Sequence, residues 1–270
     1  DRSLRFVNGD VRDFECLKRV VADVECVVHF AAVTSIPFSV EQPILTHEVN
    51  AIGTLNLLKA CLNSEIERFV LASSCAVYGE PRYLPIDEEH PVSPVSPYAV
   101  SKSEAEHHCK AFHESYGLKT VILRLFNVYG FSQGMNGEGG VVARFMERLY
   151  YGLPLIIYGD GEQTRDFVHV NDVVNAILLV LKDENGVGEV FNVGSGRRTS
   201  INGLAKTVLD LNGVNLGVTY EEPRLGDVKH SFANIEKIRD KLGYMPQISL
   251  REGLGLCYKQ NTEKQFSTRA

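Results

Sequence analysis

The chain has 270 residues, of which 44% are hydrophobic and 23% are charged. This composition is typical of a soluble globular protein with enough apolar residues for one large domain or two modest ones. The formal net charge of −6 argues against a general nucleic-acid surface and against a polybasic membrane contact. Apolar runs such as 176–181 are too short to cross a bilayer. We therefore expect neither nucleic acid nor a membrane among the partners.

The spacing of the cysteines indicates whether they could bind a metal and whether the protein works in a reducing or an oxidising compartment. The chain has 6 cysteines, and no two of them form a C-x-x-C pair. Such scattered cysteines favour small buried hydrophobic side chains over a zinc site or a redox dithiol. We predict no metal site, and we expect a reducing, cytoplasmic environment.

The first half of the chain alternates strand and helix patterns. Short apolar runs predict strands at 4–7, 25–30, 68–72 and 120–125, and longer amphipathic runs predict helices at 14–22, 44–62 and 98–116. This alternation predicts an α/β fold in which helices cover both faces of a parallel sheet.

Near residue 127 the regular alternation of strand and helix patterns ends. Glycine-rich turns occur at 137–140 and 159–161, a strand is predicted at 189–194, and a helix is predicted near 201–211. Two short helices are expected at 235–242 and 250–256. No internal repeat is visible.

Tyr98 and Lys102 are the pair that most suggests chemistry. Four residues apart, they share one face of the predicted helix, and Ser96 and Pro97 are typical of an N-cap and a first helical position. A nearby ammonium lowers the pKa of a phenol, and a phenolate can take a proton from an alcohol. The spacing alone is common, so its meaning depends on the motifs around it.

Three further motifs accompany this pair in the sequence. Ser73 and Ser74 end the predicted strand at 68–72, Leu-Arg-Leu-Phe-Asn-Val-Tyr-Gly occupies 123–130, and Gly-Asp-Gly-Glu-Gln-Thr-Arg-Asp-Phe-Val-His-Val occupies 159–170. This order resembles the extended short-chain dehydrogenase/reductases, and within them the nucleotide-sugar epimerases of the UDP-glucose 4-epimerase type. The resemblance implies a Rossmann-type core that binds NAD, at 1–127 with interleaved segments near 155–195. It also implies a smaller α/β lobe, mainly 128–270, that binds a UDP-sugar.

The resemblance assigns the reacting groups residue by residue. Tyr98 would be the catalytic base, Lys102 would tune it and hold the nicotinamide ribose, and Ser74 would hydrogen-bond the reacting sugar hydroxyl. Such chemistry needs a base, a cation and a short polar group that fixes the hydroxyl. The expected cofactor contacts are Asp10, Val11, Phe30, Ala31, Ala32, Asn50, Ser73, Tyr98, Lys102 and Phe126. We predict that His29 is a buried strand histidine and no ligand.

The expected substrate contacts are Thr34, Ser74, Asn127, Tyr158, Arg165, Arg224, Asp227 and Ser231. Asn127 and both arginines match family positions at the diphosphate, where a planar guanidinium suits phosphate oxygens. Tyr158 matches an aromatic position near the uracil, and Asp227 a contact on the ribose or phosphate side. Ser231 holds a position where a small residue leaves room for an N-acetyl group, so we expect UDP-GlcNAc and UDP-GalNAc to be accepted alongside UDP-Glc and UDP-Gal.

The sequence departs from the family pattern at its start. Family members open with a strand, a Gly-x-x-Gly-x-x-Gly turn, a helix and a second strand, and the turn holds the cofactor pyrophosphate. No such segment precedes Phe6, so these strands of the expected sheet are missing and two apolar edges should be exposed. We expect the chain to be a fragment or partial record of an enzyme. A truncated gene would leave the same gap, and so would a partner chain that supplies the missing strands.

The resemblance therefore predicts NAD-dependent 4-epimerisation of a UDP-sugar through a transient 4-keto intermediate. Cys75 and Ala76 stand where 4,6-dehydratases carry an acidic pair, which disfavours dehydration. UDP-glucuronate epimerase, a sugar reductase and a non-catalytic binding protein of this fold remain alternatives. By analogy with the family, we expect a homodimer formed through the helices at 44–62 and 98–116.

Overall fold

The computed structural model describes residues 4–130, 139–213, 216–223 and 228–268. The chain forms two compact units. Unit 1 comprises Asp1–Gly79, Pro91–Arg124 and Leu179–Phe191, and unit 2 comprises Glu80–His90, Leu125–Leu178 and Asn192–Ala270. The segment 80–90 falls outside unit 1, unlike the expected core range 1–127. The reason is its backbone pairing with unit 2, in which Ile86 N donates to Phe232 O and Asn234 N donates to Ile86 O.

Four strands form the main sheet in the order β1-β2-β3-β8. They are β1 (Cys26–His29), β2 (Arg68–Ser74), β3 (Thr120–Leu125) and β8 (Val190–Val193). β1 and β2 run parallel, with Val28 paired to Val70. The strands predicted at 25–30, 68–72, 120–125 and 189–194 are confirmed. β2 is buried along nearly its whole length, as expected for a strand covered on both faces.

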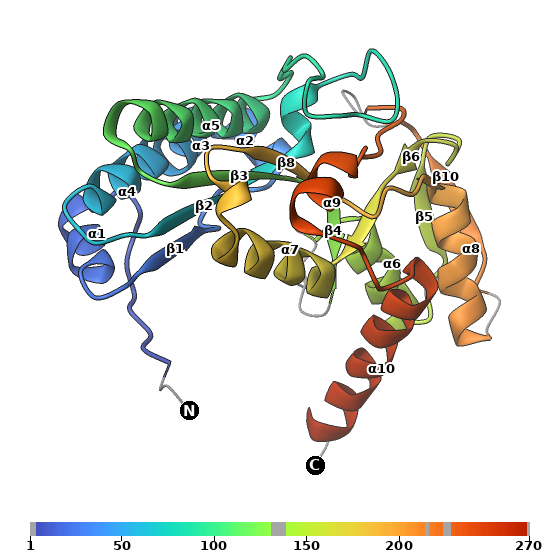
Figure 1. Cartoon of the computed structure of the whole chain (residues 1–270). Helices are drawn as coiled ribbons and strands as arrows, with labels where there is room; N and C mark the ends of the chain where they lie inside the picture. The colour runs from blue at the N-terminus through green and yellow to red at the C-terminus, as the bar shows by residue number, and fades with distance from the viewer. Residues whose placement is uncertain (1–3, 131–138, 214–215, 224–227, 269–270) are drawn as a thin grey trace. The chain divides into compact units, whose positions relative to one another are not determined.

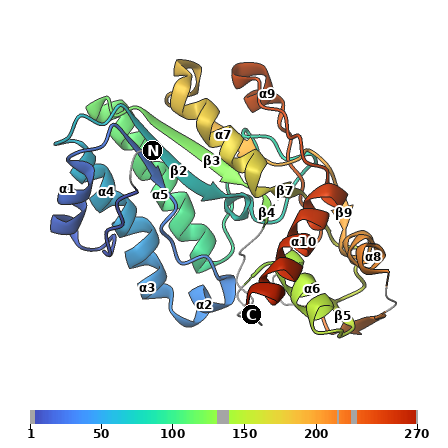
Figure 2. The ribbon, with the colours of Figure 1, turned by 90° about the horizontal axis from the view of Figure 1, so that it is seen from below.

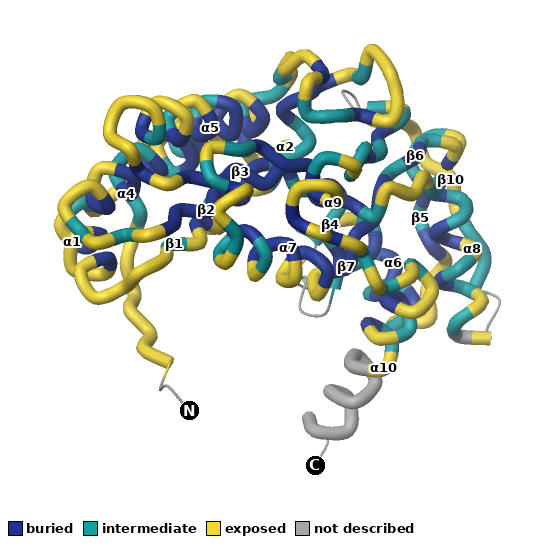
Figure 3. Tube along the Cα trace, in the orientation of Figure 1, coloured by how far each residue is buried: buried dark blue, intermediate teal, exposed yellow. Residues whose placement is uncertain are grey.

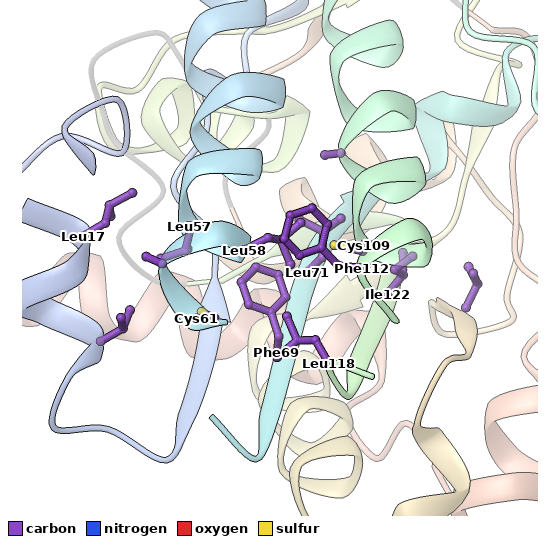
Figure 4. Close-up of a cluster of buried hydrophobic side chains, with 14 residues drawn as sticks. Leu17, Leu57, Leu58, Cys61, Phe69, Leu71, Cys109, Phe112, Leu118 and Ile122 are labelled. Carbon is purple, nitrogen blue, oxygen red and sulfur yellow. The ribbon is translucent and has the colours of Figure 1, made fainter. Parts of the chain in front are cut away.

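Three helices pack on one face of this sheet: α1 (Phe14–Val21), α4 (Gly53–Cys61) and α5 (Pro97–Tyr116) (Figure 1). The helix predicted at 98–116 is confirmed. The apolar side of each helix meets the strands in one cluster, to which α1 contributes Leu17, α4 Leu58 and α5 Phe112 (Figure 4). Phe69 of β2 lies at the centre of this cluster and is fully buried. Each such side chain stabilises the fold by about 2 kcal/mol.

The helix predicted at 44–62 is interrupted in the structure. α2 (Ile36–Glu41) leads into α3 (Pro43–His47), a π-helical turn at Glu48–Ile52 follows, and α4 completes the run. The π turn inserts an extra residue into the helical repeat, so it turns Asn50 towards the loop that follows β1. Apolar periodicity gives no sign of such a turn.

The strand predicted at 4–7 is wrong. These residues have no strand partner in the described chain, and Leu4 and Phe6 are 96% and 87% exposed (Figure 3). Strand-forming side chains cannot hold an extended segment without a neighbouring strand to bond its backbone groups. Among the described residues, the strand neighbour of β1 is β2, and Val28 of β1 is 37% exposed.

The described residues of unit 2 form three small two-stranded sheets. β5 (Leu155–Tyr158) pairs in parallel with β10 (Val218–Glu221), and β4 (Asn127–Tyr129) with β7 (Phe167–His169). β6 (Thr164–Arg165) pairs antiparallel with β9 (Thr199–Ser200).

The helices of unit 2 surround these strands. α6 (Val141–Tyr150), α8 (Ile201–Asn212) and α10 (Leu250–Thr268) share one apolar core with β5. Figure 2 shows these three helices side by side. α7 (Val170–Lys182) follows β7, and α9 (Glu236–Leu242) precedes α10. The helices predicted near 201–211, 235–242 and 250–256 are present, the last of them longer than expected. None of the helices in the described ranges has both the length and the hydropathy needed to cross a bilayer.

Candidate active site

Ser74 occupies the carboxyl end of β2, where parallel α/β sheets usually bind ligands. The strand stops there because the chain turns into a short 3₁₀ helix, Cys75–Tyr78, whose first turn Ser74 caps by accepting a hydrogen bond from Ala76 N at 3.2 Å. The Ser74 hydroxyl also lies beside the Tyr98 phenol, whose pKa it lowers. The structure therefore brings two of the predicted reacting residues into contact.

Helix α5 carries Tyr98 and Lys102 on its buried face. Ser96 caps the helix by accepting a hydrogen bond from Ala99 N at 3.2 Å, and Pro97 is the first helical residue, as the sequence predicted. The Tyr98 amide, left without a partner in the first turn, donates to Ser39 Oγ of α2 at 3.2 Å. Only 9% of Tyr98 and 6% of Lys102 is exposed. Both side chains therefore lie inside the protein and largely away from water.

The electrostatics of the pair differ from the expectation that Lys102 lowers the pKa of Tyr98. Burial raises the pKa of the Tyr98 phenol above its ordinary value, and the hydrogen bond with Ser74 opposes that rise. Burial also lowers the pKa of Lys102 to about 8, while the charge of Glu106 raises it. Desolvation thus dominates both groups, because each charged form loses its hydration inside the protein.

The loop after β1 is fixed by Asn50. Its side-chain oxygen accepts a hydrogen bond from Val33 N at 2.7 Å, and its amide nitrogen donates to Val33 O at 2.9 Å. The same nitrogen donates to Ser101 Oγ of α5 at 2.9 Å. Asn50 is 1% exposed, so it is a buried clamp on the loop.

This clamped loop holds several predicted contacts. Phe30 and Ala31 are exposed, Ala32 is half-buried, and Thr34 is exposed. The small side chains leave the backbone accessible to a flat ligand group. His29 at the strand end is 4% exposed and its Nε2 lies 2.9 Å from Thr54 Oγ1, which agrees with its predicted buried role.

Asp10 and Val11 lie in the segment before α1. The Asp10 carboxylate accepts from Arg12 Nη2 at 2.7 Å, and its hydrogen bonds with Arg12 lower its pKa to about 2. A Cβ on Gly53 would lie 2.5 Å from Val11 Cγ2, so only glycine at the start of α4 lets Val11 approach so closely. The segment is thereby anchored on the helix that also carries the core residues of unit 1.

Ser73, one of the predicted cofactor contacts, has its side chain bonded within unit 1. Its hydroxyl donates to Glu106 Oε1 at 2.5 Å, inside the protein. A cofactor contact from Ser73 would therefore come from its backbone. The sequence analysis missed Glu106 because nothing in its spacing separates it from an ordinary helical glutamate.

Unit 2 holds the other predicted contacts. Asn127 begins β4, and its side-chain oxygen is buried without a hydrogen-bond partner among the described residues. Arg165, in β6, donates from Nη1 to Thr164 O at 2.8 Å. Tyr158 ends β5 and is half-buried, and Phe126 is 4% exposed.

Ser231 is buried, and its amide donates to Thr164 O at 3.0 Å. The segment that carries it is fixed by Asp166, which the sequence analysis did not single out. The Asp166 carboxylate accepts from Ala233 N at 3.2 Å and from Gly196 N at 2.9 Å. Arg224 and Asp227 lie outside the described residues. Within the described ranges no group of acidic, histidine and cysteine side chains could hold a metal ion.

Residues 1–194 match the NAD dependent epimerase/dehydratase family. The chain belongs to this family. Its sequence is 41% identical over 251 residues to a putative UDP-glucose 4-epimerase of Methanocaldococcus jannaschii, covering 92% of this chain and 81% of that protein.

Two solved structures extend the comparison. The UDP-glucose 4-epimerase of Thermotoga maritima, solved with UDP-glucose, superposes with a TM-score of 0.94 at 38% identity, covering 98% of this chain and 86% of that one. The UDP-N-acetylglucosamine 4-epimerase of Methanobrevibacter ruminantium, in complex with UDP-N-acetylmuramic acid, gives a TM-score of 0.91 at 36% identity, with coverages of 96% and 83%. The predicted family and its Rossmann-type α/β fold are confirmed.

NAD is the cofactor of this family, and the described residues fit its nicotinamide-ribose end. Lys102 is a buried ammonium that makes no hydrogen bond or ion pair with any described residue. Three donors without partners are suited to ribose hydroxyls. The exposed backbone at Ala31 would lie beside the flat nicotinamide in such an arrangement.

Proposed function

We propose that this protein catalyses the NAD-dependent 4-epimerisation of a UDP-sugar. The observation that supports this most is the contact of the Ser74 and Tyr98 side chains, with Lys102 one turn further along the same buried helix face. A binding module would need no such set of a phenol, a hydroxyl and an ammonium.

In the proposed reaction, NAD held by Lys102 and the loop after β1 would supply the acceptor for the C4 hydride of the sugar and the donor for its return to the opposite face. Ser74 Oγ would hold the 4-hydroxyl against Tyr98. Tyr98, as the phenolate, would take the hydroxyl proton as C4 is oxidised and give it back as C4 is reduced. The Lys102 ammonium would stabilise that phenolate, which burial otherwise disfavours.

The residues of unit 2 would bind the nucleotide. Arg165 suits a diphosphate oxygen because its guanidinium carries a permanent charge on a planar fork. The buried side-chain oxygen of Asn127 has no partner among the described residues, so it can accept a hydrogen bond from the substrate. Tyr158 would stack on the uracil, and Arg224 and Asp227 complete the proposed contacts.

The first experiment measures bound cofactor and turnover in one preparation. Denatured protein is assayed for NAD, and the intact protein for conversion of UDP-Glc and UDP-GlcNAc. We expect Tyr98→Phe to lower the rate about a thousand-fold, since the base is lost. Tyr116→Phe on the same helix is the control, because Tyr116 is 62% exposed and its variant should keep the wild-type rate. Unchanged turnover in Tyr98→Phe would contradict the proposal.

Ser231 supports acceptance of N-acetylated sugars. It is a small side chain, 8% exposed, on a segment fixed by backbone hydrogen bonds. We expect Ser231→Tyr to lower kcat/KM for UDP-GlcNAc more than tenfold and to spare UDP-Glc, since the added ring fills the space of the acetyl group. Steady-state assays on both substrates test this, with Ser231→Ala as the control. Equal losses on both sugars would refute this substrate choice.

A homodimer and a cytoplasmic location remain part of the proposal. The helices at 36–62 and α5 expose apolar side chains, including Ile44 at 75% and Val100 at 41%. A second copy could cover this surface, since contiguous exposed apolar side chains commonly mark interfaces. All six cysteines are free thiols, which is consistent with a reducing compartment.

A further inference from the structure

Glu106 forms a buried ion pair inside unit 1. Arg124 Nη2 donates to its Oε2 at 2.7 Å, and Arg124 Nε donates to its Oε1 at 3.0 Å, so the pair is bidentate. Each side chain is only 3% exposed. Arg124 is itself held by Tyr78, whose hydroxyl accepts from Nη1 at 3.0 Å and whose ring lies 4.8 Å from the guanidinium carbon. The carboxylate of Glu106 is therefore fixed in position by its partners.

The same carboxylate fixes the end of β2. Ser73 Oγ donates to Glu106 Oε1 at 2.5 Å, a short hydrogen bond of the kind that carboxylates form with hydroxyls. Ser73 directly precedes Ser74, whose hydroxyl lies beside the Tyr98 phenol and lowers its pKa. A shift of Ser73 would move Ser74, because the two share one extended backbone at the strand end.

Glu106 also acts on Lys102 through charge. The two residues are four positions apart in α5, so they share one helix face. Lys102 has no ion-pair partner among the described residues, and burial lowers its pKa to about 8. The negative charge of Glu106 opposes this effect and raises the pKa of Lys102. Without the charge of Glu106, burial would lower the pKa of Lys102 further.

We propose that Glu106 is a positioning residue of this site: held by Arg124, it fixes through Ser73 the strand end that carries Ser74, and it sets the charge beside Lys102 one turn away on α5. Its effect on turnover rests on the proposed function. Its effect on Lys102 does not, because that effect is present in the protein alone.

A purely structural ion pair makes a different prediction. Removing one partner of a buried pair destabilises a protein, whatever its role, because the other charge is left uncompensated. A loss of stability or of active protein therefore does not distinguish a positioning role from a purely structural ion pair. The protonation of Lys102 does distinguish them, since only an electrostatic role of Glu106 shifts the pH at which Lys102 loses its proton.

The experiment follows the ¹⁵Nζ signal of Lys102 by NMR in lysine-labelled protein from pH 6 to 11, assigned through Lys102→Met. We expect Glu106→Gln to lower the titration midpoint by about one pH unit. Glu104→Gln is the matched control: it removes the same charge from the same helix, but this carboxylate is 42% exposed and pairs with His47 at 2.9 Å. Its midpoint should equal that of the wild type.

An unshifted midpoint in Glu106→Gln would overturn the electrostatic role. If that variant does not fold, the double variant Glu106→Gln/Arg124→Met removes both buried charges, and it should show the same direction of shift. Ser73→Ala tests the second contact: we expect kcat to fall about tenfold at unchanged KM, since only the strand end loosens. Wild-type kcat in Ser73→Ala would overturn the positioning role. Failure of the proposed function is recognised separately, as absence of turnover in the wild type.

Discussion

His29 shows how burial decides the chemistry of a single side chain. Thr54 Oγ1 donates to Asn50 O at 2.5 Å, so it has no hydrogen left for His29 and must accept from the ring Nε2–H. Burial lowers the pKa of His29 to about 4, and the charge of Lys102 adds to the effect. The imidazole is therefore neutral in the folded protein at neutral pH. It serves as a hydrogen-bond donor that ties β1 to α4.

This shift predicts a pH dependence of stability. In the unfolded chain the His29 ring binds a proton near pH 6.5, whereas in the folded chain it does so only near pH 4. Stability should therefore fall as the pH drops through this window, by about 3 kcal/mol for this group. We expect His29→Asn to flatten the slope of unfolding free energy against pH, measured by urea melts. An unchanged slope in His29→Asn would contradict the assignment.

The element that orients Ser74 is the turn after β2, and its geometry depends on Gly79. This residue has φ of +66°, and a Cβ at this position would collide with the carbonyl oxygen of Ser93. The Ser93 amide donates to Val77 O at 3.0 Å, which keeps the two segments together. The turn therefore needs glycine both for its positive φ and for the close approach of the Ser93 carbonyl.

We expect Gly79→Ala to lower the unfolding free energy by about 3 kcal/mol, since it combines backbone strain with a backbone clash. Gly117→Ala is the matched control at the end of α5. Its φ is +72°, and nothing lies within 4 Å of the added Cβ, so the cost should be only about 1 kcal/mol. Urea unfolding of both variants measures the difference. Equal costs would mean that the contact with Ser93 relaxes freely.

At the scale of the whole molecule, exposed apolar side chains at β1 bear on association between chains. Val28 on this strand is 37% exposed and the adjacent Phe30 is 51% exposed. Neighbouring exposed apolar side chains favour contact with other chains. We expect Val28→Lys to reduce concentration-dependent association beyond a dimer, measured by sedimentation velocity. Val174→Lys on α7, where the valine is 48% exposed, is the control and should leave that association unchanged.

Sequence analysis was correct where the structure depends on residues close together in the chain, and it failed where the structure depends on distant residues. Local signals were sufficient for α5, where Ser96, Pro97 and the apolar spacing give both its start and its buried face. The segment 4–7 failed because strand formation depends on a neighbour that local preference does not reveal. The roles of Asn50 and Glu106 also depend on contacts with residues 17 or more positions away, at Val33 and Ser73. Such contacts leave no periodic pattern in the sequence.

The clamp formed by Asn50 has a consequence for hydrogen exchange. Val33 belongs to a loop, yet its amide hydrogen is held by a side chain that is 1% exposed and is also bonded to Ser101 of α5. Opening the loop breaks both bonds to Val33 and leaves the side-chain oxygen of Asn50 buried without this donor, which costs more than ordinary loop motion. The Val33 amide should therefore exchange at a rate typical of α5 rather than of a loop. The protection of this amide against exchange would therefore measure how tightly the proposed cofactor loop is coupled to α5, the helix that carries Tyr98.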